Sequence, residues 1–169
     1  MGMSTGLGDQ GETDIFSGRV RKSSHRVCVL ASIDVLISWI SIVRGYFLES
    51  GASGAEHVRI ISELSEIDRY LGKICSEVAG FRTDSDWDRA TRELEQCIRL
   101  YDIGIKGFTD YSKVSEGRRL LNFCRALCRR AECDLWCMID EGLHGEDVQL
   151  SGVACYINRL SDYFAAKII

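Results

Sequence analysis

The sequence predicts an all-α fold, an up-and-down bundle of about five helices with a Gly-rich N-terminal arm. Three observations carry this prediction. Apolar residues recur at every third or fourth position over long stretches, as they do on the buried face of a helix. The 169 residues include no proline, which favours long uninterrupted helices. No stretch of the sequence sustains the alternation of apolar and polar residues that a half-buried strand requires.

Five helices are expected, separated by polar or Gly-bearing segments: 26–49, 55–79, 86–103, 117–141 and about 148–167. Thr83, Asp84 or Ser85 is the expected N-cap of the third helix. Residues 1–22 are polar and Gly-rich, so we expect a loop or arm there and no packed element. The chain is expected to form a single domain, with residues 1–25 as its N-terminal segment and 26–169 as the helical bundle.

Composition and charge exclude several classes of protein. Apolar residues make up 46% of the chain and charged residues 27%, the balance of a soluble globular protein. The net charge of −4 argues against general nucleic-acid binding, which has a basic footprint. The longest apolar stretch, Val27–Val43, contains Asp34 and is shorter than the roughly 20 residues of a membrane-spanning helix. We therefore expect a buried helix, no membrane association and a cytoplasmic protein.

The eight cysteines include two pairs at helical spacing, Cys124 with Cys128 and Cys133 with Cys137. Each pair lies on one face of a helix. However, nine residues separate Cys124 from Cys133, which places the two pairs on opposite sides. A shared metal is therefore excluded on one straight helix. The cysteines are predicted to be small buried apolar side chains in a reducing compartment.

A polar stripe runs along the fourth predicted helix through Arg118, Asn122, Arg125, Arg129 and Glu132. The far side of that helix is predicted to be apolar and to face the core: Leu120, Phe123, Leu127, Ala131 and Met138. The stripe contains arginine, which binds phosphate and carboxylate oxygens well, in a chain of negative net charge. An anion-binding site and an ordinary solvated face both remain open on spacing alone.

Asp34 is unusual because it lies inside the most apolar predicted helix. A buried carboxylate requires a partner, and a guanidinium is the expected one. Arg125 is the candidate, either within the chain or across a subunit interface. Asp162, close to Asn158 and Arg159, is a second candidate partner for the arginines.

The N-terminal segment 5–13 reads TGLGDQGET and is rich in glycine. Glycines let backbone N–H groups approach phosphates, and hydroxyl groups add donors. The segment is not a Walker A loop, because no Gly-Lys-Ser or Gly-Lys-Thr follows, and no βαβ unit surrounds it. A phosphate-binding loop and a flexible tail both fit this composition.

Taken together, separate segments resemble the PduO-type corrinoid adenosyltransferases (ATP:cob(I)alamin adenosyltransferases). Segment 5–13, followed by Gly18–Lys22, is similar to that family's TxTGDxGxT and GxRVxK. Ile33–Ile40 is similar to VDELNSWI, and Arg125–Glu132 to RxxCRRAE. Tyr156–Asp162 is similar to YLNRLSD. Because all segments occur in the family's order, the chain is identified as a member by resemblance.

The resemblance implies a homotrimer with active sites between subunits. It also implies transfer of the 5′-deoxyadenosyl group of ATP to the cobalt of cob(I)alamin or a related cob(I) corrinoid, with release of triphosphate. The implied catalytic residues are Arg129, Arg125 and Asp34, the last two pairing across the interface. Glu132 would bind Mg²⁺, and Phe108, or more weakly Phe164 or Tyr163, the corrinoid. The implied ATP contacts are Thr5, Gly8, Asp9, Gly11, Thr13, Lys22, Arg129, Glu132 and Asn158.

The sequence departs from the family pattern at several positions. Segment Phe108–Lys113 stands where the family has a Pro-Gly-Gly stretch, and Val35, Ile37 and Leu7 replace Glu, Asn and Thr. An alternative is therefore a non-catalytic member that binds ATP or corrinoid as a carrier or regulator. A helical interaction module is a third possibility. An active enzyme is expected to hand its product to an adenosylcobalamin-dependent enzyme.

Overall fold

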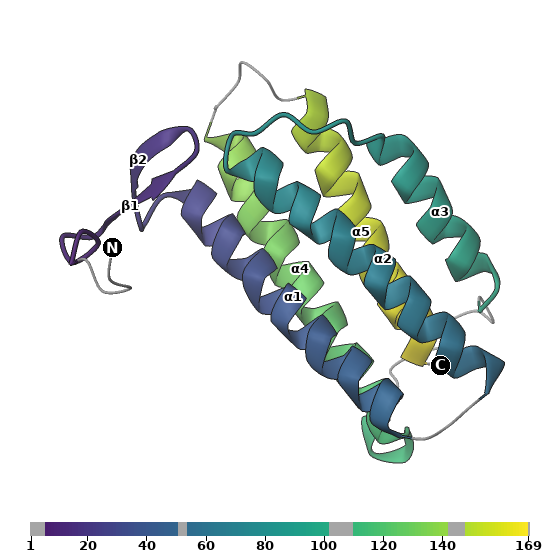
Figure 1. Cartoon of the computed structure of the whole chain (residues 1–169). Helices are drawn as coiled ribbons and strands as arrows, with labels where there is room; N and C mark the ends of the chain where they lie inside the picture. The colour runs from purple at the N-terminus through teal and green to yellow at the C-terminus, as the bar shows by residue number, and fades with distance from the viewer. Residues whose placement is uncertain (1–5, 51–53, 102–109, 142–147, 169) are drawn as a thin grey trace.

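The computed structural model describes residues 6–50, 54–101, 110–141 and 148–168. Within these ranges the predicted all-α fold is confirmed (Figure 1). The structure also contains a two-stranded antiparallel sheet and a short 3₁₀ helix, Tyr111–Lys113. The strands are β1 (Glu12–Ile15) and β2 (Gly18–Arg21). The helices are α1 (His25–Glu49), α2 (Ala55–Val78), α3 (Trp87–Arg99), α4 (Glu116–Asp140) and α5 (Val148–Ile168).

Helices α1, α2, α4 and α5 form the up-and-down bundle, and α3 packs on its outside against α5 (Figure 1). Helices α1 and α4 are antiparallel along their whole length. At one end, His25 Nδ1 lies 3.0 Å from Glu141 Oε1. At the other end, a Cβ built on Gly117 would lie 2.9 Å from the Phe47 ring. A glycine is therefore needed at position 117 for the two helices to approach this closely.

The core consists of side chains that recur at helical spacing on the inner faces. On α1 and α2 the spacing matches the periodicity from which these helices were predicted. The buried residues of α1 are Val29, Ile33, Leu36, Ile40, Val43 and Phe47. Those of α2 are Ile60, Leu64, Ile67, Leu71, Ile74 and Val78.

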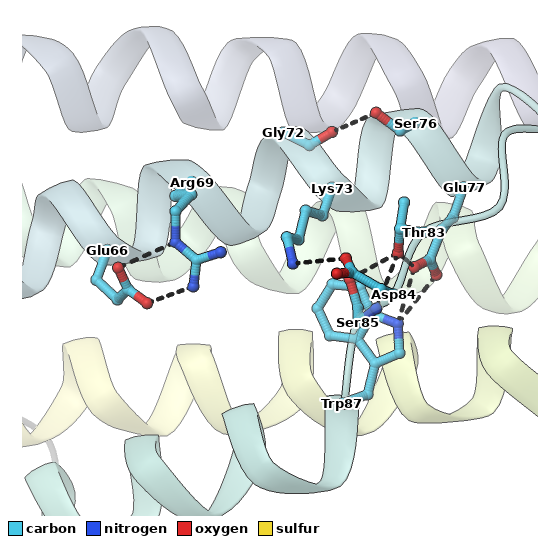
Figure 2. Close-up of polar contacts among 10 residues, drawn as sticks. All are labelled: Glu66, Arg69, Gly72, Lys73, Ser76, Glu77, Thr83, Asp84, Ser85 and Trp87. Carbon is cyan, nitrogen blue, oxygen red and sulfur yellow. Dashed lines mark hydrogen bonds and ion pairs between the residues drawn. The ribbon is translucent and has the colours of Figure 1, made fainter.

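The junction between α2 and α3 is fixed by the carboxylate of Glu77, as Figure 2 shows. Trp87 donates from Nε1 to both carboxylate oxygens, at 3.0 and 3.2 Å. The Thr83 hydroxyl bonds to the same group. The N-cap of α3 is Asp86, which accepts from Arg89 N at 2.9 Å. The expected cap at 83–85 is therefore wrong, because Thr83 is engaged by Glu77 instead.

Helix α3 ends at Arg99, four residues before the expected end at 103. The last turn tightens, because Leu100 N bonds to Cys97 O and Tyr101 N to Ile98 O, three residues back. The Tyr101 ring then packs beneath Lys167, whose Nζ lies 3.7 Å from the ring centroid. This cation–π contact joins the end of α3 to the end of α5.

The expectation of a loop without packed structure over residues 1–22 is wrong, because β1 and β2 form a hairpin. Its turn has two residues, since Ile15 pairs with Gly18. Gly18 has φ +123°, a conformation that L side chains rarely adopt. The hairpin docks on the end of α2, where Ser17 N bonds to Ala79 O at 3.1 Å.

Among the described residues, α1 is the one helix whose length and apolar composition would allow it to cross a membrane. Only 28% of its most apolar window is buried. The expected buried helix is therefore buried on one face, while the other exposes Val35 and Ile42, by 45% and 53%.

The prediction of buried cysteines holds for some of them only. Cys124 and Cys128 are buried, whereas Cys133, Cys137 and Cys155 are exposed. All eight cysteines are free thiols. Among the described residues, no group of three or more His, Cys, Asp or Glu is arranged to hold a metal ion.

Candidate active site

The polar stripe of α4 lies beside the buried seam of that helix, not opposite to it. The seam runs through Leu121, Cys124, Cys128 and Leu135, about a quarter turn from Arg125 at 100° per residue. Phe123, which was predicted to face the core, is 44% exposed. The stripe therefore follows the edge of the bundle, where a side chain can have its base in the protein and its end in solvent.

Glu132 and Asn158 join the stripe to α5. Asn158 donates from Nδ2 to Glu132 Oε1 at 2.9 Å. One turn before Glu132, Arg129 is exposed and makes no hydrogen bond or ion pair with another described residue. Arg125 is half-buried and donates from Nε to Asn122 Oδ1 at 2.9 Å. The site thus presents guanidinium, carboxylate and amide groups within two turns of α4 and one position of α5.

Cys124 and Cys128 belong to the buried seam next to this stripe. Burial raises the pKa of Cys124 to about 12 and that of Cys128 well above its usual range. Both side chains are therefore neutral thiols at physiological pH. A neutral thiol is neither a good nucleophile nor a metal ligand, so neither residue supplies chemistry to the site.

The expected burial of Asp34 is wrong within this chain, because its side chain is exposed. The Ser32 hydroxyl donates to Asp134 Oδ2 at 2.5 Å, which fixes the register of α1 against α4. Since the helices are antiparallel, Asp34 lies level with Glu132. Arg125 is seven positions away from that level, about 10 Å along the axis. An ion pair between Asp34 and Arg125 of the same chain is thus ruled out.

Asp162, the second candidate partner for the arginines of α4, already forms an ion pair with Arg159. Asp162 accepts from Arg159 Nη1 at 2.6 Å, and Arg159 Nε also lies 3.2 Å from Glu95. This set ties α5 to α3 and leaves the α4 stripe without Asp162 as a partner.

The Gly-rich segment forms two successive turns, in which Asp9 N bonds to Gly6 O and Gly11 N to Gly8 O, both at 3.2 Å. A Cβ built on Gly8 would lie 3.0 Å from Lys22 Nζ, so the ammonium group rests directly over this turn. Lys22 N bonds to Gly11 O at 2.8 Å and continues the hairpin. The structure therefore brings Gly8, Gly11 and Lys22 together.

The other predicted residues differ in how the structure places them. Thr13 lies within β1, half-buried, and Asp9 is exposed in the turn. Phe164 is completely buried and meets the Tyr163 ring edge-on at 5.3 Å. It is a core residue here, so a corrinoid contact at Phe164 is not supported. Thr5 and Phe108 lie outside the described residues.

The two halves of the predicted nucleotide site lie in different parts of the fold. Figure 1 shows the Gly-rich turns projecting away from the helices, beyond the start of α1. Glu132 and Asn158 lie on the side of the bundle, within α4 and α5.

Sequence reasoning missed Arg19, the residue that orders the hairpin. Its Nε donates to Glu12 Oε2 at 2.9 Å, and its Nη2 to Leu7 O at 2.7 Å. Asp14 accepts from Nη1 at 3.2 Å. The spacing of Glu12 and Asp14, two residues apart before an arginine, was a signal, because such side chains share one face of a strand.

Comparison with known proteins finds one family that matches almost the whole chain. Residues 3–167 match the family model for cobalamin adenosyltransferase. Corrinoid adenosyltransferase MMAB from Homo sapiens is 30% identical over 165 residues, which cover 94% of this chain and 64% of the relative. The chain thus spans less than two thirds of the human protein. Corrinoid adenosyltransferase from Bacillus subtilis is 29% identical and covers 100% of this chain and 86% of the relative.

Solved structures of PduO-type enzymes have the same fold. A variant of the PduO-type ATP:corrinoid adenosyltransferase from Lactobacillus reuteri, complexed with cobalamin and ATP, has a TM-score of 0.80 at 23% identity. That match covers 99% of this chain and 89% of the other. A second variant, complexed with ATP, has a TM-score of 0.80 at 25% identity and covers 98% and 91%. This chain belongs to the cobalamin adenosyltransferase family.

Proposed function

We propose that this protein is a corrinoid adenosyltransferase. It transfers the 5′-deoxyadenosyl group of ATP to the cobalt of cob(I)alamin or a related cob(I) corrinoid and releases triphosphate. The observation that carries the proposal is the family match across residues 3–167, which includes every described residue of the site. The geometry supports the proposal, because the Gly-rich turns, the Lys22 ammonium group and the Arg129 guanidinium group are accessible to a nucleotide.

The Gly-rich turns are proposed to hold the phosphates of ATP. Gly8 and Gly11 carry no side chain, so phosphate oxygens can come close to the backbone there, and the N–H of Gly8 is a candidate donor. The Lys22 ammonium over Gly8 adds a positive charge at the same place. Asp9 and Thr13, together with Thr5 from the sequence pattern, complete this half of the site.

Arg125 and Arg129 are proposed to stabilise the charge that develops on the leaving triphosphate. Cob(I) cobalt is itself the nucleophile, so the protein needs no catalytic serine, cysteine or base. Its task is to place C5′ of the ribose at the metal and to balance negative charge on the leaving group. The exposed guanidinium of Arg129 has no partner among the described residues and suits this role.

The residues of the site fit a magnesium ion that arrives with the nucleotide. Protein sites commonly hold Mg²⁺ through one or two carboxylates together with substrate phosphates. Glu132 offers such a carboxylate, with Oε1 oriented by Asn158. The described residues offer no cluster able to hold a metal without the nucleotide. Glu132 would bind the ion, which would neutralise charge on the triphosphate.

A homotrimer with shared active sites completes this proposal. Asp34 is exposed and forms no ion pair with another described residue, and Arg125 of a second copy is its proposed partner. The exposed apolar side chains Val35 and Ile42 on the same helix supply area for the contact. Free thiols throughout the chain suit a reducing cytoplasm, the proposed location. Transfer of the product to an adenosylcobalamin-dependent enzyme would follow.

The test is an anaerobic optical assay. The protein is mixed with chemically reduced cob(I)alamin, ATP and Mg²⁺, and the spectrum is followed for conversion to adenosylcobalamin. Conversion that requires both protein and ATP is expected. Without conversion, an increase in melting temperature with ATP would instead favour the carrier or regulator. If neither occurs, the nucleotide site is refuted as well.

A further inference from the structure

A small hollow lies between α2 and α3, with α5 as its floor. Its volume is about 80 Å³, and Ile67, Ala90 and Leu94 line its walls. Helix α3 packs closely against α5, and the small side chain of Ala90 leaves space on the side that faces α2. The hollow opens to solvent, so a ligand larger than its volume could place only one end inside.

Three tyrosine rings line this hollow: Tyr70 from α2, and Tyr156 and Tyr163 from α5. The rings of Tyr70 and Tyr156 lie 5.3 Å apart at an angle of 44°. Tyr156 is 1% exposed, and its hydroxyl forms no hydrogen bond with another described residue. The hydroxyl oxygen is not one of the fully buried atoms that lack a partner, so it is accessible to a ligand or water in the hollow.

Three glutamates surround the same hollow. Glu66 lies 2.5 Å from Arg69 (Figure 2), and Glu93 lies 2.9 Å from Arg89. Both ion pairs are near the surface, where such pairs contribute little and exchange partners readily. The third carboxylate, Glu63, is held inside by Lys167 and Tyr163. Two carboxylates at the rim are therefore available to a competing cation.

The Glu63 carboxylate disfavours a second negative charge in the hollow. Burial raises the pKa of the Cys97 thiol, and the Glu63 carboxylate adds to the increase. The same two causes, burial first, hold the pKa of Tyr163 well above its usual range. Burial disfavours a charge of either sign, whereas the Glu63 carboxylate disfavours a second negative charge, such as a phosphate or carboxylate. The hollow is therefore chemically distinct from the proposed phosphate site.

We propose that this hollow binds an alkylated organic ammonium ion. The positively charged head contacts the rings of Tyr70, Tyr156 and Tyr163, and the carboxylates of Glu66 and Glu93 balance its charge. Two of these rings already pack against cations: Arg69 lies 4.3 Å from the centroid of Tyr70, and Lys167 lies 5.2 Å from that of Tyr163. Aromatic rings combined with carboxylates are the surroundings in which quaternary ammonium ions bind. The volume of the hollow suits a compact methylated head, with the rest of the ligand in the open mouth.

The hollow is separate from the proposed ATP site. Tyr156 and Asn158 are two positions apart on α5, which places them about 200° apart around the helix. Tyr156 and Tyr163 share the face toward α2 and α3, whereas Asn158 faces Glu132 on α4. Binding in the hollow can therefore be measured without ATP or corrinoid, and it can fail while the proposed adenosyltransferase activity persists.

The test compares choline with its neutral carbon isostere, 3,3-dimethylbutan-1-ol. Both compounds are titrated into the protein and followed by saturation-transfer NMR on their methyl groups and by calorimetry, at constant ionic strength set with sodium chloride. Choline is expected to bind at least about tenfold more tightly, because only choline carries the positive charge. Equal affinity of the two compounds, or no detectable choline binding, would overturn the proposal.

Variants locate the binding to the hollow. Glu93→Gln is expected to weaken choline binding severalfold, whereas Glu56→Gln, an equal change of net charge in the first turn of α2, leaves it unchanged. Ala90→Leu fills the hollow and is expected to abolish binding. If Ala90→Leu proves unstable, the Glu93→Gln comparison decides alone. Unchanged binding in Glu93→Gln would place the ligand elsewhere and refute the site.

Discussion

The two sides of the bundle differ in how far a single chain satisfies its own polar and apolar groups. Toward α2 and α3, α5 buries Lys167 with 1% of its side chain exposed, and Glu63 supplies the countercharge at 2.5 Å. Toward solvent, α1 and α4 leave Asp34 and Arg129 without a partner among the described residues. We call the first side complete because its buried charge is paired within one chain. We call the second side incomplete because its exposed charges have no partner among the described residues.

This difference has a physical reason. A buried charge must be paired within the fold, because the cost of leaving it unpaired is several kcal/mol. A charge at the surface is solvated and can remain unpaired at little cost until a ligand arrives. Binding residues can therefore be kept ready on the α1–α4 side, while stability is concentrated on the α2–α5 side. Each prediction below disturbs one side and measures whether the other responds.

The largest effect is expected from Lys167→Met on the complete side. It leaves the largely buried Glu63 carboxylate, 15% exposed, without the Lys167 ammonium group and removes the cation–π contact with Tyr101. Breaking one partner of a buried pair destabilises by about 3–5 kcal/mol. Urea unfolding should show this loss, while the affinity for ATP below the melting transition stays near the wild-type value.

The controls for Lys167→Met are an exposed lysine and a double variant. Lys113 is 82% exposed in its ion pair with Asp110, so Lys113→Met should change stability by less than about 0.5 kcal/mol. Adding Glu63→Gln to Lys167→Met should restore part of the stability, because the unpaired charge is removed. Equal changes in unfolding free energy for Lys167→Met and Lys113→Met would show that the pair of Lys167 with Glu63 does not contribute to stability.

On the incomplete side, Arg129→Ala is expected to remove catalysis and spare the fold. Loss of one group that stabilises developing charge lowers kcat by about 10²–10³, or roughly 2.7–4 kcal/mol. The exposed position predicts a change in unfolding free energy within about 0.5 kcal/mol. The neighbouring Arg130→Ala is the control, since Arg130 pairs with Asp134 at 2.9 Å and is turned away from Asn158. Retained turnover would exclude Arg129 from the mechanism.

Asp34 tests whether the incomplete side is completed by a second copy. Asp34→Arg should weaken trimer assembly by about 2 kcal/mol or more, because two arginines then face each other across the interface. The reciprocal exchange, Asp34→Arg with Arg125→Asp, should restore assembly. Sedimentation over a range of protein concentrations measures the assembly of the single and the double variant. If the double variant assembles no better than the single one, the two residues do not form the proposed pair.

The sequence predicted the helices well, because their buried faces recur at helical spacing. It failed where that pattern was uninformative. The hairpin was missed since each strand has only four residues, too few for an alternation to be recognised. The burial of Asp34 was predicted wrongly because α1 is apolar on both faces, so periodicity could not indicate which face meets the core.

The candidate site was predicted residue by residue from resemblance, and its arrangement was not predictable. Glu132 and Asn158 are 26 positions apart, and only the packing of α4 on α5 brings them to 2.9 Å. Likewise, no local pattern indicates that the hairpin docks at Ala79. Contacts between distant segments depend on the register of the helices, which side chains across the whole core determine.

The smallest effect concerns the contact between the hairpin and the bundle, through a matched pair of glycines. Gly80 has φ +104°, and a Cβ there would lie 2.9 Å from the Cβ of Ser17. Gly80→Ala should therefore cost about 1–2 kcal/mol and displace the hairpin. Gly72 lies in α2 with open space around its Cβ position, so Gly72→Ala should stabilise by up to about 1 kcal/mol.

Kinetics then separate the role of the hairpin from that of stability. If the hairpin positions the phosphate-binding turns, Gly80→Ala raises the KM for ATP while kcat changes little, and Gly72→Ala changes neither. A KM that stays constant in both variants would mean that the Gly-rich turns are positioned without the contact between Ser17 and Ala79. The contact between the hairpin and the end of α2 would then serve stability only.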